Sequence, residues 1–170
     1  MKAPPILPEE TLRRVLRIAR FDGISVAAIA GVFALLAAAG HDVSGAVIGV
    51  IVAGAGAAEL HGVSLLHAGE PRGMRWLIGS QLYLLTAILG YVMWRLGSPD
   101  PRMVDAMRAA LTSDQRQLLQ QSGVTETEFL QMAMRLVYFC VGVATLIYQG
   151  GMVIYYSRRR AAVVQALETE

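Results

Sequence analysis

Apolar positions along this chain gather into four long stretches that contain no charged residue. The stretches cover residues 23–41, 43–58, 76–94 and 136–157. A helix needs roughly 20 apolar residues, with about 17 as the lower end, to cross the hydrocarbon core of a bilayer. The second stretch reaches this length if its helix continues past Glu59 towards Gly69. The pattern therefore predicts an all-α, polytopic integral membrane protein with four transmembrane helices.

The composition favours this interpretation over a soluble helical protein. Only 16% of the 170 residues are charged and 55% are hydrophobic, whereas about a quarter of the residues of a soluble domain are charged. Four core helices would leave a soluble chain of this length too little polar surface to cover them. The AAAG sequence at the end of the first stretch resembles a signal-peptide cleavage site. Acidic residues precede that stretch, so we expect it to remain as a helix.

The basic residues predict the orientation of the four helices. They precede the first helix, follow the fourth and lie between the second and third, at Lys2, Arg13, Arg14, Arg17, Arg20, Arg72, Arg75, Arg158, Arg159 and Arg160. The connection between the first two helices has none. Because basic loops stay in the cytoplasm, we expect both termini there. The scarcity of lysine indicates a GC-rich bacterial genome, which places the protein in a bacterial inner (plasma) membrane.

Residues 1–22 are predicted to form a cytoplasmic amphipathic N-terminal helix. Leu12, Val15, Leu16 and Ala19 share one face of such a helix. Its other face carries Arg13, Arg17 and Arg20. This pattern is typical of a helix that lies on anionic lipid headgroups. The alternative is a helix that packs against a neighbouring subunit or loop.

The remaining segments follow from the spans. Residues 23–97 carry transmembrane helices 1–3, 98–132 form an extracytoplasmic helical cap, 133–157 form helix 4 and 158–170 form a cytoplasmic basic tail. Within the cap, Asp100 and Pro101 predict a helix start, and a break is expected near Thr112–Asp114. Gly123 predicts a stop, and Thr125 with Glu128 matches a capping box. The cap either braces helices 3 and 4 or offers an interaction or gating surface.

Small residues form stripes on the first two helices. The stripe on the second helix contains Gly45, Gly49, Ala53 and Ala57, and Gly31 lies on the first. Small side chains let membrane helices approach until their backbones touch. We therefore expect a tight hairpin of helices 1 and 2, and the amount of small surface favours a homo-oligomer.

Few polar residues lie inside the spans. The candidates for a polar seam are Gln81, Gln149, Tyr83, Thr86, Tyr91, Thr145 and Tyr148. An amide in lipid needs a partner, and Gln81 and Gln149 are expected at similar depth, where they could bond to each other. The seam is either glue between helices or the lining of a permeation path. No carboxylate is expected at mid-membrane, which argues against a proton-coupled transporter.

The stretch AELHGVSLLHAGEPRGMRW, residues 58–76, combines acidic residues and histidines. Glu59, His67 and Glu70 are expected at the cytoplasmic end of helix 2, with salt bridges to Arg72 or Arg75. In an oligomer these five residues could instead form a pore mouth. A metal site is a weaker alternative because a zinc site needs three or four converging ligands with more histidine. We therefore predict no metal and no cofactor.

The chain has no phosphate-binding loop, nucleophile elbow or zinc-protease motif. We therefore expect no enzymatic activity and no nucleic-acid partner. The leading hypothesis is a homo-oligomeric channel or passive conduit for ions or small solutes in the lipid bilayer. A structural or accessory subunit, which binds a partner through the small-residue face or the outer cap, is the alternative. A redox or metal-binding membrane protein is a third hypothesis.

Overall fold

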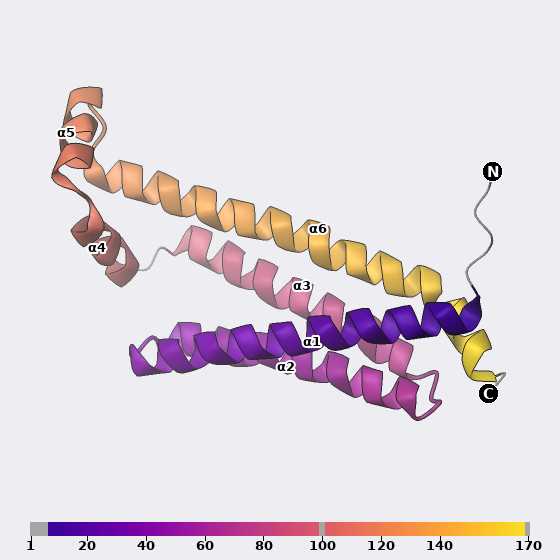
Figure 1. The fold of residues 1–170 in the computed structure, drawn as a ribbon. Helices are drawn as coiled ribbons and strands as arrows, with labels where there is room; N and C mark the ends of the chain where they lie inside the picture. Colours follow the sequence, from indigo (N-terminus) through magenta and orange to yellow (C-terminus); the bar gives the residue numbers. More distant parts are fainter. Residues whose placement is uncertain (1–6, 99–100, 169–170) are drawn as a thin grey trace, which may run out of the picture. The chain divides into compact units, whose positions relative to one another are not determined.

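The structure, a computed structural model, describes residues 7–98 and 101–168 (Figure 1). Its helices are α1 Pro8–Ala39, α2 Val43–His67, α3 Gly73–Gly97, α4 Pro101–Ala110, α5 Ser113–Ser122 and α6 Glu126–Glu168. The described ranges contain no strand. Four helices, α1, α2, α3 and α6, are long and apolar enough to cross a membrane. These features confirm the all-α prediction and fit a multi-pass membrane protein.

Helix α1 differs from its prediction because it does not break at residue 22. It starts with Pro8 in its first turn, followed by Glu9 and Glu10, a favourable arrangement at a helix N-terminus. It then continues through Asp22 and Gly23 to Ala39 as one helix of 32 residues. Gly23 lies against α2, where an added Cβ would be 3.1 Å from the Gly56 carbonyl oxygen. The predicted N-terminal helix is therefore the first part of α1.

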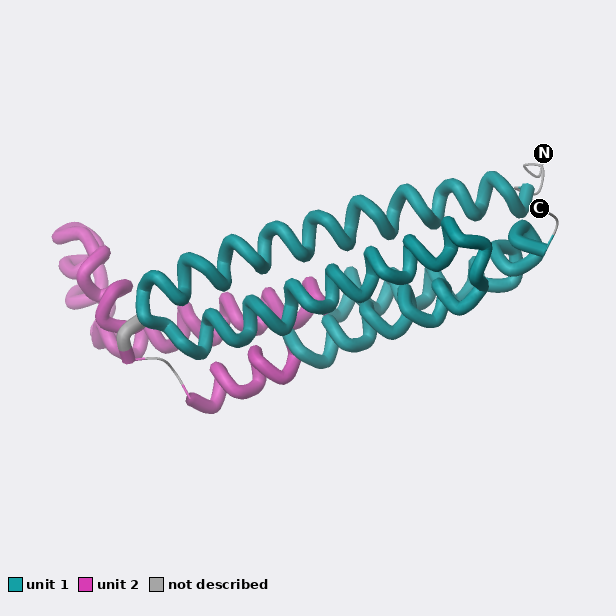
Figure 2. Tube along the Cα trace, turned by 90° about the horizontal axis from the view of Figure 1, so that it is seen from below, with its two compact units in different colours: residues 1–88, 146–170 teal, residues 89–145 magenta. Residues whose placement is uncertain are grey.

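The chain forms two compact units (Figure 2), one of residues 1–88 and 146–170 and the other of residues 89–145. Helices α3 and α6 each contribute a segment to both units. The first unit contains α1, α2, the beginning of α3 and the end of α6. The second contains the end of α3, the short helices α4 and α5, and the beginning of α6.

In the first unit, α1 and α2 form a hairpin in which they lie side by side (Figures 1 and 2). His41 adopts a left-handed conformation in the turn, with φ of 56°. Asp42 caps α2 by accepting a hydrogen bond from the Gly45 backbone N–H. The helices touch at Gly49, where an added Cβ would lie 2.8 Å from the Ala34 Cβ.

Gly45 also packs against α1, where an added Cβ would lie 3.1 Å from the Ala37 Cβ. The remaining predicted packing residues are placed differently. Ala53 is half-buried and Ala57 is exposed. An added Cβ at Gly31 would meet no atom within 4 Å. The close contact between α1 and α2 continues instead at Gly56, where an added Cβ would lie 2.7 Å from the Ala27 nitrogen. The contact stripe drifts around α2 from Gly49 to Gly56 because 3.6 residues make one turn.

The hydrophobic core of the first unit gathers segments of all four long helices. Its buried members are Leu12, Val15, Ala19, Val63, Leu66, Met74, Leu77, Tyr156, Val163 and Ala166. The apolar face predicted to lie on lipid is therefore covered by the chain itself. Arg13, Arg17 and Arg20 on the opposite face remain exposed.

Caps mark several helix ends in the second unit, and those at Gly123 and Thr125 match the sequence prediction. Helix α4 begins at Pro101, while Asp100, its predicted N-cap, lies outside the described residues. Helix α5 has a capping box formed by Thr112 and Gln115, and it ends at Gly123 in the left-handed conformation. Thr125 and Glu128 form a second capping box at the start of α6, which confirms the sequence prediction.

Candidate functional site

A cluster of polar side chains lies between the four long helices of the first unit. Asp22 comes from α1, Glu59 from α2, Gln81 from α3, and Tyr148 and Tyr156 from α6. We call these five residues the carboxylate cluster. Asp22, Glu59 and Gln81 are 5%, 2% and 0% exposed, so solvent does not satisfy their polar atoms.

The Gln81 amide joins the two carboxylates. Its Nε2 donates one hydrogen bond to Asp22 Oδ2 at 2.8 Å and another to Glu59 Oε2 at 3.0 Å. An amide nitrogen carries two N–H donors, and the two bonds use both of them. One side chain of α3 therefore links α1 to α2 inside the unit.

The two tyrosines occupy the remaining carboxylate oxygens. Tyr156 Oη donates to Glu59 Oε1 at 2.7 Å, and Tyr148 Oη donates to Asp22 Oδ1 at 2.8 Å. Tyr156 is completely buried, whereas Tyr148 is 53% exposed. The hydrogen-bonded chain therefore runs from a tyrosine at the surface of the unit, through both acids, to a buried tyrosine.

The carboxylate cluster has no basic partner. Within the described part of the chain, no arginine or histidine forms an ion pair with Asp22 or Glu59. Burial of an unpaired charge is costly, and two carboxylates that share a site repel each other when both are ionised.

Three buried oxygens have no hydrogen-bond partner among the described residues, namely the Tyr155 hydroxyl and two amide oxygens. The amide oxygens are Gln81 Oε1 and Gln149 Oε1. Both side chains are at least nine-tenths buried, with exposed fractions of 0% and 5%. A buried acceptor without a donor is uncommon in a folded protein. These oxygens are free to accept a bond from a protonated group.

The predicted polar seam is only partly assembled. Gln81 bonds to Asp22 and Glu59 rather than to Gln149. Thr86 is exposed and donates to the Leu82 carbonyl of its own helix. Tyr83 is also exposed, and Thr145 is half-buried in the second unit. Of the seam candidates, Gln81 and Tyr148 belong to the carboxylate cluster.

The predicted mouth residues do not converge either. Glu70 forms an ion pair with Arg72 at 3.0 Å, and His67 Nδ1 lies 3.0 Å from the carbonyl oxygen of Val63. Glu59, by contrast, faces the interior two helical turns away from the end of α2, so it cannot take part in the expected salt bridge. The described residues contain no group of three His, Cys, Asp or Glu side chains that could hold a metal ion.

Asp22 is the member of the carboxylate cluster that sequence reasoning missed most clearly. It was assigned to the end of a separate helix, and no buried carboxylate was expected. Asp22 follows Ala19 by three residues and Val15 by seven, so it continues the same helical face. That face is buried in the structure. A search for polar residues on the extended apolar stripe would have identified it.

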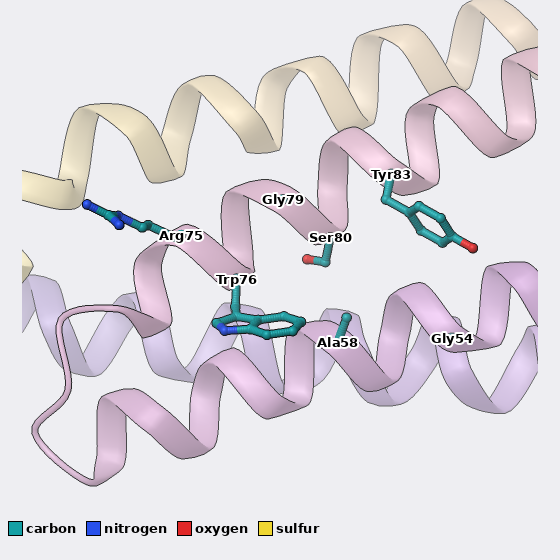
Figure 3. A pocket seen from close by; sticks show the side chains of 7 residues that line it. All are labelled: Gly54, Ala58, Arg75, Trp76, Gly79, Ser80 and Tyr83. Atoms are coloured by element: carbon teal, nitrogen blue, oxygen red, sulfur yellow. The ribbon is translucent and has the colours of Figure 1, made fainter.

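A groove lies on the surface of the first unit between α2 and α3 (Figure 3). Its volume is about 480 Å³. It is lined by Gly54, Ala58, Arg75, Trp76, Gly79, Ser80 and Tyr83. Arg75, a predicted mouth residue, and Tyr83, a predicted seam residue, therefore lie at the groove and not at the carboxylate cluster.

Comparison of the chain with protein-family models, with curated proteins and with solved structures finds no match. The proposals that follow therefore rest on the residues and their geometry.

Proposed function

We propose that this protein is a non-enzymatic conduit of a bacterial inner membrane and that its permeant ion is the proton. The observation that carries the proposal is the sharing of one buried amide by Asp22 and Glu59. Ionisable residues inside a membrane are costly and commonly mark ion pathways and proton relays. The sequence predicts no carboxylate at mid-membrane and so argues against a proton-coupled transporter. The proposal relies instead on Asp22 and Glu59, which are buried between the helices.

The hydrogen-bond pattern supports a proton more than a larger ion. Each of the four carboxylate oxygens already accepts a bond from an amide or a phenol. A proton can bind to one of these oxygens without displacing a neighbour, whereas a metal ion requires several ligands to converge on open space. Tyr148 supports access, because it is half exposed and its hydroxyl contacts Asp22.

Proton flux into liposomes tests the proposal. The purified protein is reconstituted with a pH-sensitive dye in the lumen, and a potassium gradient with valinomycin sets the membrane potential. We expect faster acidification of the lumen than in protein-free liposomes. Asp22→Asn and Glu59→Gln should each lower the proton flux at least tenfold, because neither replacement binds a proton. Glu70→Gln is the matched control, since Glu70 pairs with Arg72 in the connection between α2 and α3.

Two results would contradict the proposal of a conduit, and a third would contradict the proton as its permeant ion. One is equal flux in liposomes with and without the protein. The other is unchanged flux in Asp22→Asn and Glu59→Gln when both variants keep the elution profile and helical content of the parent protein. A flux that requires sodium and ignores the pH gradient would also exclude the proton as the permeant ion.

The orientation and assembly belong to the same proposal. Basic residues at both ends of the chain support cytoplasmic termini. Gly150 and Gly151 support a homo-oligomer, since an added Cβ at either would meet no atom within 4 Å and small residues favour close helix contacts. An accessory subunit that binds through the small face of α2 has less support, because α1 covers Gly49 and Gly56.

A further inference from the structure

The groove between α2 and α3 results from how these two helices diverge. Near the turn that joins them they touch, and an added Cβ at Gly62 would lie 3.0 Å from both the Gly73 carbonyl oxygen and the Trp76 Cβ. Further along, an added Cβ at Gly54 or Gly79 would meet no atom within 4 Å. The groove opens where small residues on both helices leave the space between them empty.

The floor and walls of the groove are apolar. Gly54, Ala58 and Gly79 leave the floor close to the level of the backbone, and the Trp76 and Tyr83 rings flank it (Figure 3). Ser80 contributes a hydroxyl, but that hydroxyl donates to the Leu77 carbonyl of its own helix at 2.9 Å. The floor therefore offers contact area and no unsatisfied polar group to a ligand.

Charge is confined to one end of the groove. Arg75 lies in the first turn of α3, and Tyr83 lies eight residues later, about 12 Å along the helix at 1.5 Å per residue. In the described ranges, no carboxylate forms an ion pair with Arg75. Tryptophan beside it is typical of the membrane–water interface. The groove thus combines an interfacial cation with an apolar channel that leads away from it.

We infer that this groove binds one anionic phospholipid, with an acyl chain between Trp76 and Tyr83 and the headgroup phosphate on Arg75. A guanidinium matches the geometry of a phosphate and binds it through parallel N–H donors. The two rings are seven residues apart, about 10 Å along α3. A helix with its side chains is about 10–12 Å wide, so an acyl chain fits between the rings more readily than a helix of a second copy.

Native mass spectrometry of the detergent-purified protein tests the inference. Phosphatidylglycerol and phosphatidylcholine with identical acyl chains are titrated separately, and bound lipid is counted. We expect about tenfold tighter binding of phosphatidylglycerol, in line with a charged hydrogen bond. Arg75→Gln should remove this preference and Arg75→Lys should keep part of it. Arg72→Gln is the matched control because Arg72 is exposed and paired with Glu70.

A second variant tests the acyl-chain part of the site. Gly79→Leu fills the open space and adds a better helix former, so the variant should fold while it loses both lipids. Equal binding of the two lipids by the parent protein, or unchanged selectivity in Arg75→Gln, would overturn the inference. Displacement of phosphatidylglycerol by inorganic phosphate alone would also overturn it. The inference would also be overturned if Gly79→Leu abolished a dimer but kept the bound lipid. The occupant of the groove would then be a second copy of the chain.

Discussion

Tyr156 on α6 donates a 2.7 Å hydrogen bond to Glu59 on α2, a residue 97 positions earlier in the chain. Both side chains are buried, with exposed fractions of 0% and 2%. The bond therefore ties the end of α6 to the hairpin of α1 and α2. It also fixes one oxygen of Glu59 while Gln81 fixes the other.

Replacement of Tyr156 by phenylalanine should destabilise the protein without changing its fold. The variant leaves a buried carboxylate oxygen without its donor, which costs on the order of 1–2 kcal/mol. Unfolding in mixed micelles at increasing denaturing detergent measures the change. Tyr83→Phe is the control, since its ring is half exposed, and it should unfold like the parent protein. Equal stability of the two variants would show that the Tyr156 hydroxyl does not stabilise the unit.

Replacement of Gln81 by leucine should lower the free energy of unfolding much more than replacement of Gln149 by leucine. Gln81→Leu removes the donor that both carboxylates share, so it leaves two buried oxygens unsatisfied and should cost about 2–4 kcal/mol. Gln149 has a buried oxygen that accepts no bond within the described residues, so Gln149→Leu should cost less. The same unfolding measurement compares them. A larger loss in Gln149→Leu would contradict the assigned role of Gln81.

The sequence predicted the long elements because their causes are local. Uncharged stretches of about 20 residues indicate spans by length alone, and the caps at Thr112, Gly123 and Thr125 follow from side chains that bond to nearby backbone. The structure reproduces these starts and stops. The sequence predicts a boundary at residue 22 because Asp22 precedes the first uncharged stretch, whereas α1 continues through it.

The carboxylate cluster could not be predicted in the same way, because its members meet through long-range packing. Gln81 contacts Asp22 across 59 positions and Tyr148 contacts Asp22 across 126. A single sequence gives the face on which each residue lies but not which faces meet. Depth alone predicts the pairing of Gln81 with Gln149, whereas the Gln81 amide bonds to Asp22 and Glu59 in the structure.

A methyl group at Gly56 should disrupt the α1–α2 hairpin. An added Cβ would lie 2.7 Å from the Gly23 carbonyl oxygen and from the Ala27 nitrogen, and backbone atoms cannot move aside as a flexible side chain can. We expect Gly56→Ala to lower stability by about 1–3 kcal/mol. Gly54→Ala, two residues earlier on the same helix, meets no atom within 4 Å and should be neutral or slightly stabilising.

The comparison of these two alanine variants removes the effect of helix propensity, since both replace a helical glycine. Unfolding in mixed micelles gives the stability difference. Gly49→Leu should also lower the free energy of unfolding, because an added Cβ at Gly49 would lie 2.9 Å from the Ala34 backbone. If Gly56→Ala and Gly54→Ala were equally stable, α1 and α2 would not approach as closely as the structure indicates.

The start of α6 depends on Thr125. Its Oγ1 accepts a hydrogen bond from the Glu128 N–H at 3.3 Å. In return, Glu128 Oε2 accepts hydrogen bonds from the Thr125 N–H and from its hydroxyl. Thr125→Ala removes the cap, and we expect about fivefold faster hydrogen exchange in the first turn of α6. Thr125→Ser keeps the hydroxyl and should exchange at nearly the parent rate. Exchange measured by mass spectrometry on peptides that cover residues 124–134 separates these outcomes. Equal acceleration in both variants would mean that the methyl group of Thr125, rather than its hydroxyl, stabilises the start of the helix.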